Sequence, residues 1–437
     1  MKSRTSWVVA VVFVVAAPLF AMDDPANEIQ NGWRAFNDPL LNRVVEQVKQ
    51  ENLDIQVANA RVREAKAAAQ TPRAGLWPSI SLVGSLARGN TISIKDASIN
   101  RLGIQGSWAL DFFGEAEFKV KAADARLDLQ AAALEDARQR VISELVAAVI
   151  RWRENRMVVQ LMSDQIRELD IQVALQADLV TAGLSDALPV LQTQSTKSQL
   201  DSKLLLVEAE VATAIYQIDQ LVGSTDNRMV AELVATAPVQ IELPVFKTVL
   251  AEDVAVLQNR PDVREARAAL AGAGADFAQA EAALWPEVSV GGLYEVQSVT
   301  EGVLQNGAQV WSVNADFKAP IFNFGQLQSL ADAANARNAE AVSQYQSTLK
   351  KALQSLRTAV VSYTQSMESV TAWQASVRHQ HSALSLARDQ FQAGFTNYIS
   401  RSAVEIEYLQ TRIGATQQYG NAARSYIELQ RALGSAY

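Results

Sequence analysis

The sequence predicts an α+β protein built from two tandem repeats, in which long helices carry most of the chain. Two segments, residues 115–182 and 326–393, contain neither Gly nor Pro and are rich in residues that favour helix. Each is preceded by a pair of segments in which apolar and polar residues alternate, the pattern of half-exposed strands. The same motifs then occur twice in the same order. As one helix, each long segment would extend about 100 Å, more than an ordinary globular domain needs.

Apolar residues in both long segments follow the four-three spacing of a coiled coil. In the first they are Leu127, Ala131, Leu134, Val141, Leu145, Ala148 and Trp152, with Arg138 as the polar exception. In the second they are Val342, Tyr345, Leu349, Ala352, Leu356, Ala359 and Tyr363. Taken alone, these helices are equally typical of a coiled-coil scaffold without a pore.

Composition excludes several classes of function. The 437 residues are 49% hydrophobic and 20% charged, with a net charge of -8, which is ample for a core. No basic tract points to a nucleic-acid partner. The absence of cysteine excludes disulfides, cysteine nucleophiles, thiolate metal sites and a thioether lipid anchor.

Residues 1–21 resemble a signal peptide. Lys2 and Arg4 form a charged start, and Trp7 to Ala17 is an apolar run too short to span a membrane. Pro18 and the ending Leu19-Phe20-Ala21 resemble a cleavage site. A short membrane anchor is the alternative. Export would make a cytosolic scaffold a poor interpretation.

The first repeat is predicted over residues 22–223. Asp38-Pro39 starts a helix that reaches about Gln70 and is ended by Pro72 and Pro78. A strand pair follows over 78–113, then the long helix over 115–182 and a return helix over 186–222. The glycine at 183 is expected to terminate the long helix, with Ser185 or Asp186 capping the return helix.

The second repeat is predicted over residues 249–437, after a connecting segment at 224–248. It again begins with a helix. Its strand pair covers 286–322, its long helix 326–393 and its return helix 396–434. Leu76-Trp77-Pro78 at the start of the first strand pair reappears as Leu284-Trp285-Pro286, and Ala182-Gly183 reappears as Ala393-Gly394.

Four strands with one apolar and one polar face cannot close a small barrel, which needs about eight. Three chains would supply twelve strands to one barrel and leave no open edge. The strands are long enough to cross a membrane when tilted. The predicted fold is therefore an α+β membrane protein in which a trimer forms a 12-stranded β-barrel continued by a long α-helical, coiled-coil tube.

The chain resembles the outer-membrane factor family, the trimeric channel-tunnels of the TolC and OprM/NodT type. The resemblance extends from about Trp33 to Gly434. It is carried by the doubled Leu-Trp-Pro motifs, the two Ala-Gly tips, and the segments Trp108-Ala109-Leu110-Asp111-Phe112-Phe113-Gly114 and Pro320-Ile321-Phe322-Asn323-Phe324-Gly325.

This resemblance implies a bacterial outer-membrane location with a tunnel that extends into the periplasm. The implied function is the passive duct of a tripartite efflux system that exports small or toxic compounds. The implied partners are two further copies of the chain, a periplasmic adaptor (membrane fusion) protein, an inner-membrane transporter and outer-membrane lipid. The outlet of a type I protein secretion system is an alternative with the same architecture.

The resemblance also implies two kinds of site. Adaptor docking is expected at the hairpin tips, which here read Ala182, Gly183, Leu184, Ser185 and Ala393, Gly394, Phe395, Thr396. Family members usually narrow the tunnel with acidic residues just past the second tip, often in a Leu-Asp-Ala sequence. This chain has Ala403 at the expected Asp position, so Asp186 and Glu405 are the substitute aperture candidates.

The remaining motifs do not indicate an enzyme. His379 and His381 are the two histidines of the chain, and their i, i+2 spacing places them on different helix faces. Glu405 and Glu407 diverge for the same reason. Ala271-Gly272-Ala273-Gly274 lies within an Ala-rich helical run rather than after a strand, so close helix packing explains it better than a nucleotide loop. The sequence predicts no catalytic residue, cofactor or metal.

Overall fold

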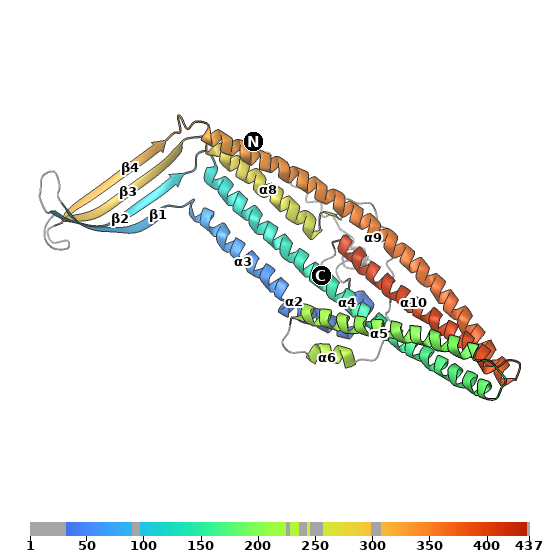
Figure 1. The fold of residues 1–437 in the computed structure, drawn as a ribbon. Helices are drawn as coiled ribbons and strands as arrows, with labels where there is room; N and C mark the ends of the chain where they lie inside the picture. The colour runs from blue at the N-terminus through green and yellow to red at the C-terminus, as the bar shows by residue number, and fades with distance from the viewer. Residues whose placement is uncertain are drawn as a thin grey trace, which may run out of the picture.

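Two long helices run the length of the protein. α4 (Glu115–Thr181) and α9 (Gln326–Gln392) extend from a four-stranded sheet at one end to two hairpin tips at the other (Figure 1). The computed structural model describes residues 32–89, 97–223, 228–235, 243–244, 257–298 and 307–434. The predicted signal peptide at 1–21 lies outside these residues, as does most of the connecting segment 224–248.

Both long helices begin at a glycine in the left-handed conformation. The φ angles of Gly114 and Gly325 are 81° and 79°. Other residues adopt this conformation only with strain, so glycine allows the chain to turn sharply from strand into helix. The sequence analysis expected the helices over 115–182 and 326–393, within one residue of their observed ends.

The return helices begin two residues later than the predicted 186 and 396. α5 (Leu188–Val222) starts after Asp186, whose carboxylate accepts a hydrogen bond from the Leu188 amide at 3.1 Å. α10 (Tyr398–Ala432) starts after Asn397, whose side chain accepts from the Ser400 amide at 2.9 Å. These local side-chain bonds satisfy amides that the first helical turn leaves unpaired.

The predicted single helix from Asp38 to Gln70 is wrong, because the chain breaks at Asn52. A short 3-10 helix, η1 (Arg34–Phe36), leads into α2 (Pro39–Glu51), and α3 (Leu53–Ala74) follows. The Asn52 side chain accepts from the Ile55 amide at 3.1 Å and donates to the Leu221 carbonyl at 2.7 Å. Pro72 does not end α3 but lies in its last turn.

The predicted connecting segment also contains a helix, α6 (Arg228–Ala235). The Arg156 guanidinium on α4 donates to the Val234 carbonyl at 3.3 Å, so α6 is attached to the long helix. The sequence analysis missed α6 because eight residues between turn-forming segments provide too little periodicity to distinguish a helix.

The helices form a wall whose members change at mid-length. In the half nearest the sheet, α4 packs against α3 and against α8 (Pro261–Ala282), and α8 packs against α9. In the half nearest the tips, α4 packs against α5 and α10, and α10 packs against α9. α9 therefore forms one edge of the wall throughout, while α3 and then α5 form the other (Figure 1).

The main core lies at mid-length, where the two sets of helices meet. The four-three stripe of α4 is buried from Leu134 to Trp152, and the α9 stripe is buried from Ala352 to Tyr363. Residues of η1, α2 and the ends of α5 and α10 complete this cluster. The four-three spacing found in the sequence therefore marks the buried faces of both helices over these ranges.

The sheet is antiparallel with the order β1-β2-β3-β4. Its strands are β1 (Ser79–Gly89), β2 (Ala97–Leu110), β3 (Glu287–Ser298) and β4 (Ala308–Lys318). The strands thus begin and end inside the predicted ranges 78–113 and 286–322. β1 and β4 each keep one edge that no strand of the described chain covers.

One face of the sheet is a continuous apolar surface. A single row across all four strands pairs Leu82 with Ile104, Ile104 with Tyr294 and Tyr294 with Trp311. All four side chains are exposed in the single chain. The adjacent row presents the opposite face, with Ser81 paired to Gln105 and Leu293 to Ser312. This alternation is the pattern predicted for strands with lipid on one side and water on the other.

Among the helices of the described residues, none contains an apolar segment long enough to cross a membrane.

Candidate functional site: hairpin tips and the contacts behind them

Each long helix ends at its tip in the same hydrogen-bonded turn. In the first tip the Gly183 amide donates to the Val180 carbonyl at 3.0 Å, and the Leu184 amide donates to the Leu179 carbonyl at 2.9 Å. In the second, Gly394 donates to Phe391 at 3.1 Å and Phe395 to Gln390 at 2.8 Å. This Schellman arrangement requires a left-handed residue, and the φ angles of Gly183 and Gly394 are 72° and 79°.

The tips are open surfaces of small and apolar residues. A Cβ atom placed on either glycine would meet nothing within 4 Å. Ala182 and Ala393 are exposed beside them, and the apolar side chains that follow, Leu184 and Phe395, are 76% and 84% exposed. Ser185 is exposed and Thr396 half-buried. Both tips lie at the end of the molecule remote from the sheet (Figure 1), so the structure brings the predicted docking residues together.

The two aperture candidates differ in their surroundings. Asp186 is exposed, and its carboxylate accepts a hydrogen bond from the first amide of α5. Glu405 on α10 is only 15% exposed and forms ion pairs with Arg401 at 2.6 Å and with Arg388 of α9 at 2.7 Å. Glu405 is therefore a neutralised carboxylate between helices.

A group of residues around Glu168 on α4 joins the two hairpins. Its carboxylate accepts hydrogen bonds from the Tyr398 hydroxyl at 3.1 Å and the Ser402 hydroxyl at 3.0 Å, and it pairs with Arg401 at 3.2 Å. Arg401 also pairs with Glu405, and its guanidinium lies 4.6 Å from the centre of the Tyr398 ring. We call Glu168, Tyr398, Arg401, Ser402 and Glu405 the inter-hairpin cluster.

The inter-hairpin cluster is largely sheltered from solvent. Ser402 is fully buried, and the Glu168 and Arg401 side chains are 17% and 14% exposed. Burial and the neighbouring Glu168 carboxylate raise the pKa of Tyr398, so its hydroxyl stays protonated and donates to Glu168. Removing Arg401 would leave two partly buried carboxylates without their shared counter-charge, which is costly.

Sequence reasoning missed most of this cluster. The Arg401–Glu405 pair has the i, i+4 spacing of a helix-surface ion pair and could have been found. Glu168 could not, because it lies in the first repeat and its partners lie in the second.

The two histidines and the Gly-containing run of α8 show no feature of a catalytic or nucleotide site among the described residues. His379 and His381 are both exposed on α9. A Cβ on Gly272 of α8 would lie 3.6 Å from Ala125 of α4, so this glycine lies at a close contact between helices.

Comparisons with known proteins agree with this architecture. The family model described as outer membrane efflux protein matches residues 44–224 and 254–435, one match for each repeat. Nodulation protein T of Rhizobium leguminosarum bv. trifolii is 23% identical over 93% of this chain and 87% of its own length. The cation efflux system protein CusC of Escherichia coli K12 is 25% identical over 89% of this chain and 85% of its own.

Solved structures share the whole fold. The outer-membrane channel OprN superposes with a TM-score of 0.82 at 24% identity, covering 93% of this chain and 92% of that one. The outer-membrane protein VceC of Vibrio cholerae superposes with a TM-score of 0.81 at 20% identity, covering 93% and 99%. The predicted α+β fold with two tandem repeats is therefore confirmed, and the chain belongs to the outer membrane efflux protein family and is an outer-membrane channel protein.

Proposed function

We propose that this outer-membrane channel is the passive duct of a tripartite efflux system. Small or toxic compounds would pass through it from the periplasm to the exterior, and an inner-membrane transporter would supply the energy. The observation that carries the proposal is that the sheet and the helical wall each leave the same two edges uncovered by other elements of the described chain. β1, α3 and α5 lie on one edge, and β4 and α9 on the other.

Three copies joined edge to edge give one continuous tube. Twelve strands form the barrel, and the helical walls continue it away from the membrane. The apolar row through Leu82, Ile104, Tyr294 and Trp311 then faces outward to lipid, and the adjacent row, which is polar apart from Leu293, faces the lumen. A water-filled tube of this kind needs no binding site for its cargo. That CusC is named a cation efflux protein favours efflux over protein secretion.

Deletion of the gene tests efflux against secretion. We expect the deletion strain to become more sensitive to toxic small molecules, while the set of secreted proteins stays unchanged. The measurements are growth inhibition by a panel of toxic compounds and the protein content of the culture medium. Loss of a secreted protein with unchanged sensitivity would identify the type I outlet instead.

Adaptor docking at the tips predicts that a large side chain introduced there blocks export without disrupting the trimer. Gly183→Trp or Gly394→Trp should reduce export to the level of the deletion strain, since the large ring would project from the open surface where the adaptor is proposed to dock. The trimer should persist, because the tips lie about 100 Å from the strands along the helices. Export by complemented cells and trimer yield from the outer membrane are measured together.

Gly183→Ala and Gly394→Ala are the matched controls for backbone strain. Alanine at positive φ costs about 1 kcal/mol but adds little volume, so export should be retained. If the alanine and tryptophan variants lost export equally, or if both lost the trimer, the glycines would act only as helix stops.

For the aperture, we propose that the inter-hairpin cluster holds the two hairpins together near the tips and so sets the width of the periplasmic opening. Glu405 would contribute by its ion pairs with Arg401 and with Arg388 of α9. Asp186 would remain an exposed charge at the first tip. The contacts of Glu168 with Tyr398, Arg401 and Ser402 are the polar links from α4 to α10 that support this role.

Replacing Arg401 tests this proposal. Arg401→Ala should increase the single-channel conductance of the purified trimer in planar bilayers. The variant removes the guanidinium that Glu168 of the first hairpin shares with Glu405 of the second, so the two hairpins would be held together less tightly. The matched control is Lys197→Ala, which also removes one cation but breaks a pair with Asp170 inside the first hairpin. Equal conductance of the two variants would exclude a role for the cluster at the aperture.

A further inference from the structure

The two halves of the sheet are paired in the same register. Ser79 of β1 lies opposite Ser107 of β2, and Glu287 of β3 lies opposite Lys318 of β4. These positions are equivalent within their repeats. Ser79 and Glu287 each follow the proline of a Leu-Trp-Pro motif, and Ser107 and Lys318 each lie seven residues before the glycine that precedes a long helix. The two strand pairs are therefore one unit built twice, residue for residue.

A third pairing, between β2 and β3, joins the two repeats. In this joint Ile104 of β2 lies opposite Tyr294 of β3, and Gln105 lies opposite Leu293. The joint uses the outer edge of β2 in the first repeat and the outer edge of β3 in the second. The equivalent edges are those of β4 and β1, which no other strand of the described chain covers. The free edges of the sheet thus correspond to the two edges that already pair with each other inside the chain.

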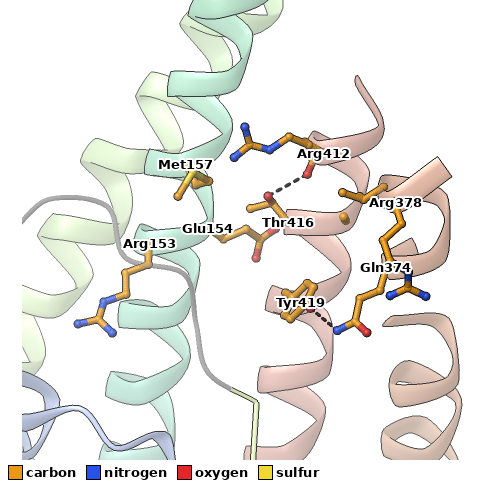
Figure 2. A pocket seen from close by; sticks show the side chains of 10 residues that line it. Arg153, Glu154, Met157, Gln374, Arg378, Arg412, Thr416 and Tyr419 are labelled. Carbon is orange, nitrogen blue, oxygen red and sulfur yellow. Dashed lines mark hydrogen bonds between the residues drawn. The ribbon is translucent and has the colours of Figure 1, made fainter. Parts of the chain in front are cut away.

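The helical wall is joined across the same boundary. α4 of the first repeat packs against α8 near the sheet and against α10 near the tips. Figure 2 shows part of the second contact, where Glu154 of α4 and Thr416 of α10 line one cavity. By repeat equivalence α9 corresponds to α4, while α3 and α8 each have 22 residues and α5 and α10 each have 35. The outer flank of α9 therefore corresponds to a surface that, on α4, is covered by the equivalents of α3 and α5.

We propose that β4 of one copy pairs with β1 of the next copy in the register of the β2–β3 joint. Transfer of that joint to the equivalent residues places Asp316 opposite Ser85 of the next copy. Residues 312–318 of β4 then run antiparallel to residues 83–89 of β1. This inference rests on the proposed sharing of one barrel by three copies, and it adds which residues meet where two copies join.

Side chains on the lipid face suit this register. Phe317 is 69% exposed in the single chain, and the register places it opposite Gly84 in the interior of β1. A glycine inside a strand leaves a gap in the apolar surface, which an aromatic ring on the neighbouring strand can cover. The register also places the small Ala315 opposite Leu86, which is 74% exposed in the single chain. Large and small side chains therefore alternate across the proposed joint.

Charges on the lumen face suit the same register. Ser85 is paired within its own chain with Arg101 of β2, so Asp316 of the neighbouring copy lies two strands from Arg101 with only a serine between them. Two strand spacings are about 10 Å, a distance that the long arginine side chain can largely span towards a carboxylate. A slip of two residues would place Val83 or Ala87 opposite Asp316 and move the aspartate away from this arginine.

Paired cysteines test the register directly, because the chain contains no cysteine of its own. Directly opposite residues on antiparallel strands have Cα atoms about 4.5–5.5 Å apart, within the range for a disulfide, whereas diagonal neighbours are about 7–8 Å apart. Asp316→Cys combined with Ser85→Cys should therefore link copies into a covalent set of three after oxidation in outer membranes. The measurement is denaturing, non-reducing electrophoresis. β1 and β4 are opposite edges of one sheet, so this disulfide cannot form within a flat single chain.

The matched controls keep Asp316→Cys and move the second cysteine by two residues on the same face, to Val83→Cys or Ala87→Cys. Each control should give little cross-linked product. Stronger cross-linking by either control would overturn the proposed register while leaving a shared barrel in place. Absence of cross-linked copies in all three variants would overturn the pairing of β4 with β1.

A second set of variants gives the same test on the lipid face if those at Asp316 do not reach the outer membrane. Ala315→Cys with Leu86→Cys should cross-link, and Ala315→Cys with Gly84→Cys or Arg88→Cys should not. Sensitivity of the cells to toxic compounds reports efflux separately. A different register in cells with normal efflux would contradict this inference alone, and the proposed register in a protein without efflux would contradict the efflux proposal alone.

Discussion

Burial of the apolar stripes along α4 and α9 is the constraint on which the rest of the structure depends. In proteins most of the stability of a helix comes from the packing of its apolar face, and along these two helices different neighbours cover that face in turn. α4 obtains four such neighbours by using α3 and α8 near the sheet and α5 and α10 near the tips. The densest burial, around Ile142, Leu145 and Trp152, lies where these two sets meet.

The same constraint explains why one chain is incomplete. A wall of helices packed side by side leaves its outermost members with one open flank, as a sheet leaves its edge strands. Exposed apolar residues such as Leu205 and Leu206 on α5 and Leu386 on α9 lie on these outer helices. Joining copies edge to edge covers the helix flanks and the strand edges in one step, and what remains open is the interior of a tube. The function proposed for this channel therefore follows from the way the apolar faces of its helices are covered by neighbouring helices.

Features set by local chemistry could be predicted from the sequence. The long helices followed from uninterrupted helix-forming residues, the strands from alternation, and the tips from the paired Ala-Gly motifs, because each depends on neighbours a few residues away. The break at Asn52 could not be predicted, since the carbonyl that holds the Asn52 side chain belongs to Leu221. The inter-hairpin cluster was missed for the same reason, because Glu168 and Arg401 meet only after both repeats have folded. Sequence reasoning selected Glu405 by its place after the tip, whereas the structure gives that carboxylate two arginine partners.

The central claim is that three copies of the chain share one barrel and one tube. The most direct test is the mass of the protein extracted from the outer membrane in mild detergent, measured by native mass spectrometry. The account predicts a species of three chains that dissociates only when the fold itself is lost, because strand edges and helix flanks are covered together. A folded, stable single chain under these conditions would contradict it.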